Sequence, residues 1–254
     1  MKKITLVVFI CSSLVLCACS RKGEQTTDAA QSTALKTTTT SATSPDYAAI
    51  AATTEKEAAQ GNAEAQKTLG VLYADGTGVP QDYKIAATWF EKAAAQGNAE
   101  AQYNLGEFYA NAKGVTQNYN TAKEWYEKSA NQDFGWAQYR LGSLYANGQS
   151  VKQDYKLAAD WYLKAASQGN SEAQYYLGDM YAKGQPGVTK DLTKAKTWYE
   201  KSASQGDAAA QYNVGNIYAQ GLGVPKDIKQ AKEWFTKSAA AGYAPAQEAL
   251  GKLK

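Results

Sequence analysis

The chain has 254 residues and a formal charge of +3, from 27 lysines and arginines against 24 aspartates and glutamates, and this near balance argues against a nucleic-acid partner. Histidine is absent and all three cysteines lie within the first nineteen residues, so the remaining chain has no imidazole or thiol for a general base, a zinc site or a disulfide framework. This composition favours a non-catalytic binding protein that needs no metal or other cofactor.

Residues 1–18 are predicted to be a secretory signal peptide. Lys2 and Lys3 precede an apolar run from Ile4 to Leu16, and small residues follow it. A short basic segment, an apolar core and a small-residue processing site are the three parts of such a signal. A permanent transmembrane helix is the weaker alternative, because crossing a bilayer takes about 20 apolar residues and this run has fewer.

The tetrapeptide Leu16-Cys17-Ala18-Cys19 resembles the bacterial lipobox. The resemblance implies that Cys19 becomes the lipidated first residue of the mature protein. The alternative anchor, Cys17, places Leu16 where the processing enzyme needs a small side chain. Ser20 stands where this family of lipoproteins has an aspartate if it stays at the inner membrane, which implies the outer membrane. We expect a protein that is lipid-anchored in the bacterial cell envelope and faces the periplasm.

A disordered tether is predicted to follow the lipidated cysteine, over residues 19–44. Residues 20–44 contain eight threonines and almost no large apolar side chain. Such a segment cannot bury enough apolar surface to fold, so we expect it to hold the folded part of the chain away from the membrane.

Residues 45–254 are predicted to form one array of repeats. An Ala-Gln pair recurs at spacings of 36, 36, 36, 37 and 36 residues, and a Trp followed by Phe or Tyr recurs in the same rhythm. A fixed period of this length indicates stacked copies of one supersecondary unit. Residues 46–64 align without gaps on residues 82–100, so we expect a half repeat, five full repeats and a partial C-terminal repeat. The recurring tryptophans are Trp89, Trp125, Trp161, Trp198 and Trp234.

The consensus of these copies, A-Q-x-x-L-G-x-x-Y-x-x-G-x-G-V-x-x-D-x-x-x-A-x-x-W-[FY], resembles the Sel1-like repeat, a relative of the tetratricopeptide repeat. The resemblance implies an all-α fold, a right-handed superhelical solenoid of antiparallel helix pairs. It also implies that the protein binds other proteins.

Most aromatic residues are predicted to pack in the core of this array. In the first helix of a unit, Ala65, Leu69 and Tyr73 lie four residues apart on one face, and Gly70 allows a neighbouring helix to approach. The second helix has a matching stripe that includes the Trp-Phe/Tyr pair. We expect the five pairs in the core, together with Tyr73, Tyr109, Tyr145, Tyr181 and Tyr218.

The opposite, outward side of each first helix is the candidate binding surface. In tetratricopeptide-like arrays this side lines the concave surface. With the Ala of each Ala-Gln pair as position 1, position 7 carries Glu107 and Asp179, and position 3 carries a tyrosine in four successive units. Tyrosine is enriched at protein interfaces, although position 3 packing against the preceding unit is an open alternative. The four tyrosines are Tyr103, Tyr139, Tyr175 and Tyr212.

The second unit departs from the pattern in a way that indicates a binding anchor. Asp133-Phe134-Gly135-Trp136 stands where other units have Gly-Asn-Ala-Glu or a close variant, and Trp136 falls at position 0 of the outward side. Trp, Tyr and Arg are enriched among binding hot spots. We expect Phe134, Trp136, Tyr139 and Arg140 to anchor a protein partner, and the alternative is a repacked turn hidden between units.

The expected function is that of a membrane-anchored periplasmic scaffold or adaptor that binds a protein partner. The family resemblance supplies a narrower alternative, because some Sel1-like lipoproteins are immunity proteins that neutralise phospholipase toxins delivered into the periplasm. A β-lactamase-like enzyme is unlikely here, since that branch of the family has cysteine pairs in its repeats and no Ser-x-x-Lys motif lies in a catalytic context. Aromatic rows also bind sugars, so peptidoglycan stays open as a ligand.

Overall fold

The computed structural model describes residues 46–253. The chain divides into two units, Met1–Ser44 and Pro45–Lys254, and the described residues all belong to the second. The predicted signal peptide, the lipidation of Cys19 and the tether lie outside the described residues and stay predictions. Within 46–253, no helix is both long enough and apolar enough to span a bilayer.

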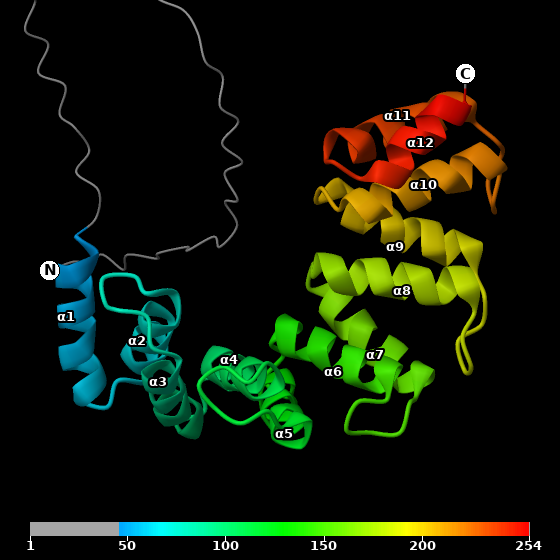
Figure 1. Cartoon of the computed structure of the whole chain (residues 1–254). Helices are drawn as coiled ribbons and strands as arrows, with labels where there is room; N and C mark the ends of the chain where they lie inside the picture. The colour runs from blue at the N-terminus through cyan, green and yellow to red at the C-terminus, as the bar shows by residue number, and fades with distance from the viewer. Residues whose placement is uncertain (1–45, 254) are drawn as a thin grey trace, which may run out of the picture. The chain divides into compact units, whose positions relative to one another are not determined.

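Twelve helices follow one another in the described part of the chain, and each packs mainly against the helix before it and the helix after it (Figure 1). This confirms the predicted all-α solenoid. Helices α2–α11 form five helix pairs, which α1 precedes and α12 follows. The helices are α1 (Tyr47–Ala59), α2 (Ala63–Asp75), α3 (Tyr83–Ala95), α4 (Ala99–Ala110), α5 (Tyr119–Ala130), α6 (Gly135–Asn147), α7 (Tyr155–Ser167), α8 (Ser171–Lys183), α9 (Leu192–Ser204), α10 (Ala208–Gln220), α11 (Ile228–Ala240) and α12 (Ala244–Lys252).

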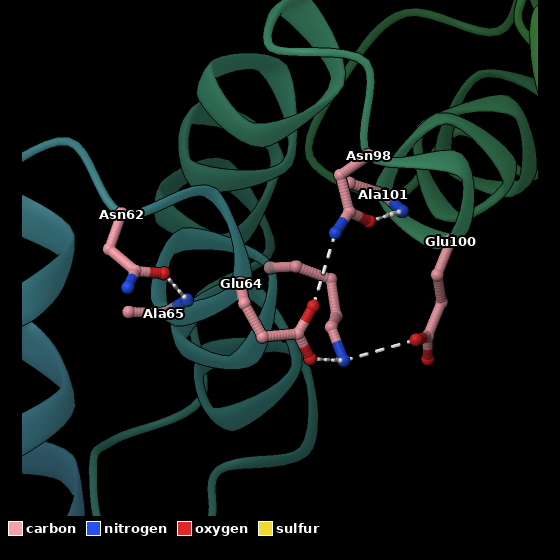
Figure 2. Close-up of polar contacts among 7 residues, drawn as sticks. Asn62, Glu64, Ala65, Asn98, Glu100 and Ala101 are labelled. Carbon is pink, nitrogen blue, oxygen red and sulfur yellow. Dashed lines mark hydrogen bonds and ion pairs between the residues drawn. The ribbon is translucent and has the colours of Figure 1, made fainter.

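Most first helices begin at an Asn or Asp cap. The Asn62 Oδ1 atom accepts a hydrogen bond from the Ala65 backbone N–H at 2.9 Å, and Asn98 caps Ala101 in the same way at 2.8 Å (Figure 2). Such a cap satisfies one of the backbone donors that a helix leaves unpaired at its start. The caps therefore set the start of each first helix at the same place in the repeat.

The two helices of a unit meet where a glycine lies under an aromatic ring. A Cβ atom added to Gly106 would lie 2.5 Å from Cε1 of Tyr126, and the same glycine contacts the equivalent ring in all five full repeats. These rings follow the recurring tryptophans and are buried, as predicted. They belong to Phe90, Tyr126, Tyr162, Tyr199 and Phe235.

The recurring tryptophans are only partly buried, so the prediction that they lie in the core is wrong. Trp125, for example, packs against the cluster of the preceding unit and has one face under the Lys128 Nζ atom, 3.9 Å from the ring centroid. All five tryptophans carry such a lysine at 3.9–4.3 Å, a cation–π contact that covers the ring beside solvent. Five tyrosines predicted for the core are also only partly buried, namely Tyr73, Tyr109, Tyr145, Tyr181 and Tyr218.

A row of glutamines connects each unit to the next. The buried Gln102 donates through Nε2 to the Ala94 carbonyl at 3.1 Å, and its Oε1 accepts from Gln132 Nε2 at 2.7 Å. The glutamine–glutamine bond lies within a unit, where it connects the first helix to a residue at the end of the second helix, and it recurs in four units with distances of 2.7–2.8 Å. These bonds explain why a polar residue is buried at position 2 of every full repeat.

The last full repeat lacks this bond, which makes Ala241→Gln a stabilising substitution. Ala241 stands where the other units have the donating glutamine, and the Gln211 Oε1 atom is buried without a partner. The backbone at Ala241 (φ −79°, ψ 5°) matches that at Gln96 (φ −85°, ψ 4°), so a glutamine can adopt the same geometry. We expect about 1 kcal/mol of added stability in urea denaturation, and an unchanged midpoint would contradict it.

Candidate partner-binding site

The structure brings the predicted anchor residues together around α4, α6 and α8. Phe134 contacts Tyr103 of the preceding unit at 5.4 Å between ring centroids, with the ring planes tilted by 52°. Trp136 contacts Tyr139 edge-on at 6.5 Å, and the Arg140 guanidinium lies 5.6 Å from the Tyr139 ring centroid. The second and third units therefore share one aromatic cluster on the outward side of their first helices.

The position-3 tyrosines are partly buried rather than free on the surface. Each ring packs against the buried ring of its own unit, at centroid distances of 5.5–6.1 Å. Tyr103 and Tyr212 also contact an aromatic residue of the following unit. Burial, helped by the Glu107 charge, raises the pKa of Tyr103 to about 12. These tyrosines thus contribute to packing as well as to the outward surface, and their role in binding stays a prediction.

Phe134 replaces the asparagine cap that starts other first helices. Helix α6 has no side-chain cap hydrogen bond, and the Phe134 ring lies on Tyr103 instead. Tyr243 takes the same position at the start of α12 and contacts Tyr212 with the same centroid distance of 5.4 Å and the same tilt of 52°. Because both uncapped helices begin with such a contact, an aromatic contact with the preceding unit takes the place of the asparagine cap. Phe134 therefore packs between units.

Arg140 and Glu107 form an ion pair between neighbouring first helices. The Arg140 Nη2 atom lies 2.6 Å from Glu107 Oε2, and the Tyr126 hydroxyl donates to the other carboxylate oxygen. Burial lowers the pKa of Arg140, but the charge and hydrogen bond of Glu107 outweigh it and raise that pKa. Burial and the same carboxylate raise the pKa of Tyr126 far above its usual range. Arg140 is therefore engaged inside the protein and joins two units.

Asp179, at the corresponding position of α8, is also engaged. Lys183 Nζ lies 2.7 Å from its Oδ2 atom, and the Tyr199 hydroxyl donates to Oδ1 at 3.5 Å. Burial, helped by the Asp179 charge, raises the pKa of Tyr199 well above its usual range. Glu107 and Asp179 thus connect the first helix of a unit to its second helix, and their role in binding stays a prediction.

Two large aromatic side chains are well exposed on these helices. Trp136 is 44% exposed, as its position predicted, and Tyr176 is 42% exposed. Tyr176 was missed by sequence reasoning, because it lies at position 4, where other units have Thr, Asn or Arg. It stacks on Tyr139 at 5.9 Å and on Tyr162 at 5.7 Å. A single aromatic residue at an otherwise polar position was the signal that could have found it.

A pocket of about 500 Å³ lies beside Trp136, between the turns that precede α6 and α8. No group of three metal-ligating side chains occurs among residues 46–253. The pocket walls combine an aromatic ring, amides and carboxylates, a composition that recognises polar or charged segments. Its lining includes Asp133, Phe134, Trp136, Gln168, Asn170 and Glu172.

Known structures with related sequences share this fold. A protective antigen of uropathogenic Escherichia coli, c5321, is 39% identical with a TM-score of 0.77, and the match covers 82% of this chain and 44% of that one. A Sel1 repeat protein of Oxalobacter formigenes is 37% identical with a TM-score of 0.71, covering 76% of this chain and 78% of that one. This chain therefore spans less than half the length of the E. coli antigen.

A more distant match is the immunity protein Pa5087 of Pseudomonas aeruginosa, 24% identical with a TM-score of 0.52. It covers 81% of this chain and 78% of that one, and the likeness concerns the fold alone. No curated protein matches the chain.

The Sel1 repeat model matches five consecutive segments, residues 63–98, 99–134, 137–170, 171–207 and 208–243. These segments reproduce the five full repeats seen as helix pairs and cover well over half of the sequence. The chain therefore belongs to the Sel1 repeat family.

Proposed function

We propose that the chain is a non-catalytic scaffold, lipid-anchored in the bacterial envelope, that binds one protein partner along the outward sides of α4, α6 and α8. The Sel1 repeat scaffold is a protein-interaction fold. The observation that carries the proposal is Trp136, which is 44% exposed at a position where the other units have Glu, Ala or Pro. Exposed Trp and Tyr in one patch are the residue types that dominate binding energy at protein interfaces.

The envelope location in this proposal is supported by the sequence alone. The lipobox-like tetrapeptide ending at Cys19 and the threonine-rich segment after it support a membrane anchor before the repeats. A lipid-anchored scaffold meets its partner at the membrane surface, where both are held at a high effective concentration.

Site-directed crosslinking in cells tests the partner-binding surface. Tyr176 is replaced by the photo-crosslinking residue p-benzoylphenylalanine, with Trp136 left intact, and the cells are irradiated. We expect one crosslinked product of defined mass, because Tyr176 lies exposed beside the aromatic cluster. Mass spectrometry of the product identifies the partner.

The matched control carries the same photo-crosslinker in place of Ile85, which is 39% exposed on α3. A crosslink yield at least tenfold lower is expected there. Equal products from both sites, or none from either, would contradict partner binding by the outward surface. A Cys19→Ser chain in the same cells is expected to leave the membrane fraction, and its retention there would contradict the lipid anchor.

A narrower form of the same function is that of an immunity protein, whose partner is a phospholipase toxin that enters the periplasm. The anchor expected at Cys19 supports this form, because it holds an inhibitor at the membrane that such a toxin attacks. If the crosslinked partner proves to be a lipase, co-expression of this chain is expected to restore growth of cells that produce the periplasm-targeted enzyme.

A further inference from the structure

In the first full repeat, the residue at position 0 accepts a hydrogen bond from the cap of the next first helix. Figure 2 shows Glu64 accepting from Asn98, at 3.2 Å between Glu64 Oε2 and Asn98 Nδ2. The other Glu64 oxygen lies 2.6 Å from Lys67 Nζ, which also reaches Glu100 at 3.0 Å. The cap asparagine thus uses both ends of its amide, Oδ1 toward its own helix and Nδ2 toward the preceding unit.

This connection is broken where Trp136 occupies position 0. Asn170 still caps α8, with its Oδ1 atom 2.7 Å from the Ala173 nitrogen. Its Nδ2 atom, however, is buried and has no hydrogen-bond partner, and Asn170 as a whole is only 9% exposed. A buried amide donor without an acceptor is destabilising, so an acceptor that reached Asn170 Nδ2 would relieve this cost.

The carboxylate of Glu172, which lines the same pocket, lacks a counterpart of the hydrogen bond that Glu64 accepts from Asn98. Glu172 is at position 0 of α8, where it would accept from the cap of α10. That cap is Asp207, which has no N–H to donate. Within residues 46–253, Glu172 forms no ion pair and no side-chain hydrogen bond, and its charge adds to the rise in the pKa of Tyr139.

Asp133 is the second carboxylate of the pocket and has an unfavourable backbone. Its φ is +60°, in the left-handed region, and the equivalent residue of every other unit is a glycine with φ between +86° and +96°. Left-handed geometry is strained for a residue with a Cβ atom. Departures from a repeated pattern are concentrated at functional sites. Three of them border this pocket, namely Trp136 at position 0, the carboxylate of Glu172, which is unpaired within residues 46–253, and the left-handed backbone of Asp133.

We propose that this pocket binds an arginine side chain of the partner protein. The guanidinium lies against the Trp136 ring and near the carboxylates of Asp133 and Glu172, and a main-chain carbonyl of the same segment accepts from Asn170 Nδ2. The pocket has two carboxylates and no lysine or arginine in its lining, so it favours a positively charged ligand. Arginine combines a cation with a planar face that stacks on indole.

The Nδ2 atom of Asn170 is covered in the free protein, so neighbouring side chains must move for a carbonyl to reach this donor. Side-chain rearrangements of this kind are common at interfaces whose backbone hardly moves. The inference rests on the proposed function, since it names the chemistry of the partner segment at the same surface.

The binding test uses the purified full chain labelled with 5-fluorotryptophan, whose fluorine signals report each of the six tryptophans separately. The probe is N-acetyl-arginine-N-methylamide, and the control probe is its citrulline analogue, which has nearly the same shape and no charge. We expect the Trp136 signal alone to shift and to saturate at millimolar arginine probe, with citrulline at least tenfold weaker. No shift, equal binding of citrulline, or tighter binding of an N-acetylglucosamine dimer would overturn the proposal.

Two variants separate binding from folding. Glu172→Gln keeps the Trp136 signal and is expected to weaken arginine binding at least fivefold with an unchanged melting temperature. The matched control is Glu124→Gln, an exposed glutamate of α5, which should alter neither. Equal affinity of the wild-type chain and Glu172→Gln for the arginine probe would show that the Glu172 carboxylate takes no part in binding.

Trp136→Glu introduces the residue that three other units have at position 0 and is expected to give Asn170 Nδ2 an acceptor, as Glu64 does for Asn98. We expect a melting temperature no lower than that of the wild-type chain, together with at least a tenfold loss of the partner crosslink at Tyr176. A crosslink that persists in this variant would overturn the arginine pocket and leave the proposed function standing. The absence of any crosslink in the wild-type chain would instead count against the proposed function.

Discussion

Replacing Gly106 by alanine is expected to lower the free energy of unfolding by about 2–3 kcal/mol. The new Cβ atom would lie 2.5 Å from Cε1 of Tyr126, well inside van der Waals contact. The Tyr126 side chain is 1% exposed and its hydroxyl donates to Glu107, so the ring has no space to move away. Helices α4 and α5 must therefore separate, and urea denaturation followed by circular dichroism measures the loss.

Gly251→Ala is the matched control for this substitution. Gly251 is the corresponding residue of α12, and no atom outside its own helix lies within 4 Å of a Cβ placed there. Alanine favours the helix over glycine by up to about 1 kcal/mol, so this variant should be as stable as the wild-type chain or slightly more stable. If Gly106→Ala proves equally harmless, the contact between glycine and ring does not limit helix packing.

Leu141→Ala is expected to destabilise the array by about 3 kcal/mol. Leu141 is fully buried in the cluster between α5 and α6, so its removal leaves a cavity that rigid helices do not fill. Because a solenoid unit contacts only its neighbours, damage to a central unit also weakens the two junctions beside it. The expected result is a lower midpoint of thermal and urea unfolding.

The control for this cavity is Leu163→Ala, the same change at a leucine that is 41% exposed on α7. A change of less than about 0.5 kcal/mol is expected, because surface substitutions remove little buried area. Similar losses at the two positions would mean that burial in the structure does not determine stability.

The sequence predicted the architecture because one period repeats through it. The Ala-Gln and Trp landmarks set the register of every helix pair, and the structure reproduces the five full repeats. The burial of Trp125 and its equivalents was overestimated, because periodicity assigns a residue to a face and does not reveal the lysine that covers its outer side.

The candidate site was less predictable, because its contacts join residues in different units. Arg140 was expected as a free anchor, but it pairs with Glu107, 33 residues earlier in the chain. The unpartnered amide of Asn170 lines the same pocket as Trp136, which lies in the preceding unit. Helical periodicity within one unit carries no information about such pairs, whereas a comparison of equivalent positions across units does.

The glutamine row has a consequence for how this protein can change its length. At each junction the buried glutamine donates to an alanine carbonyl of the preceding unit, so excision or duplication of one complete period recreates the same hydrogen bond between units. The protein can therefore gain or lose whole repeats during evolution without new contacts between the remaining units. The unit that carries Trp136 is the exception, because a chain without this unit would still fold but would lack the proposed binding pocket.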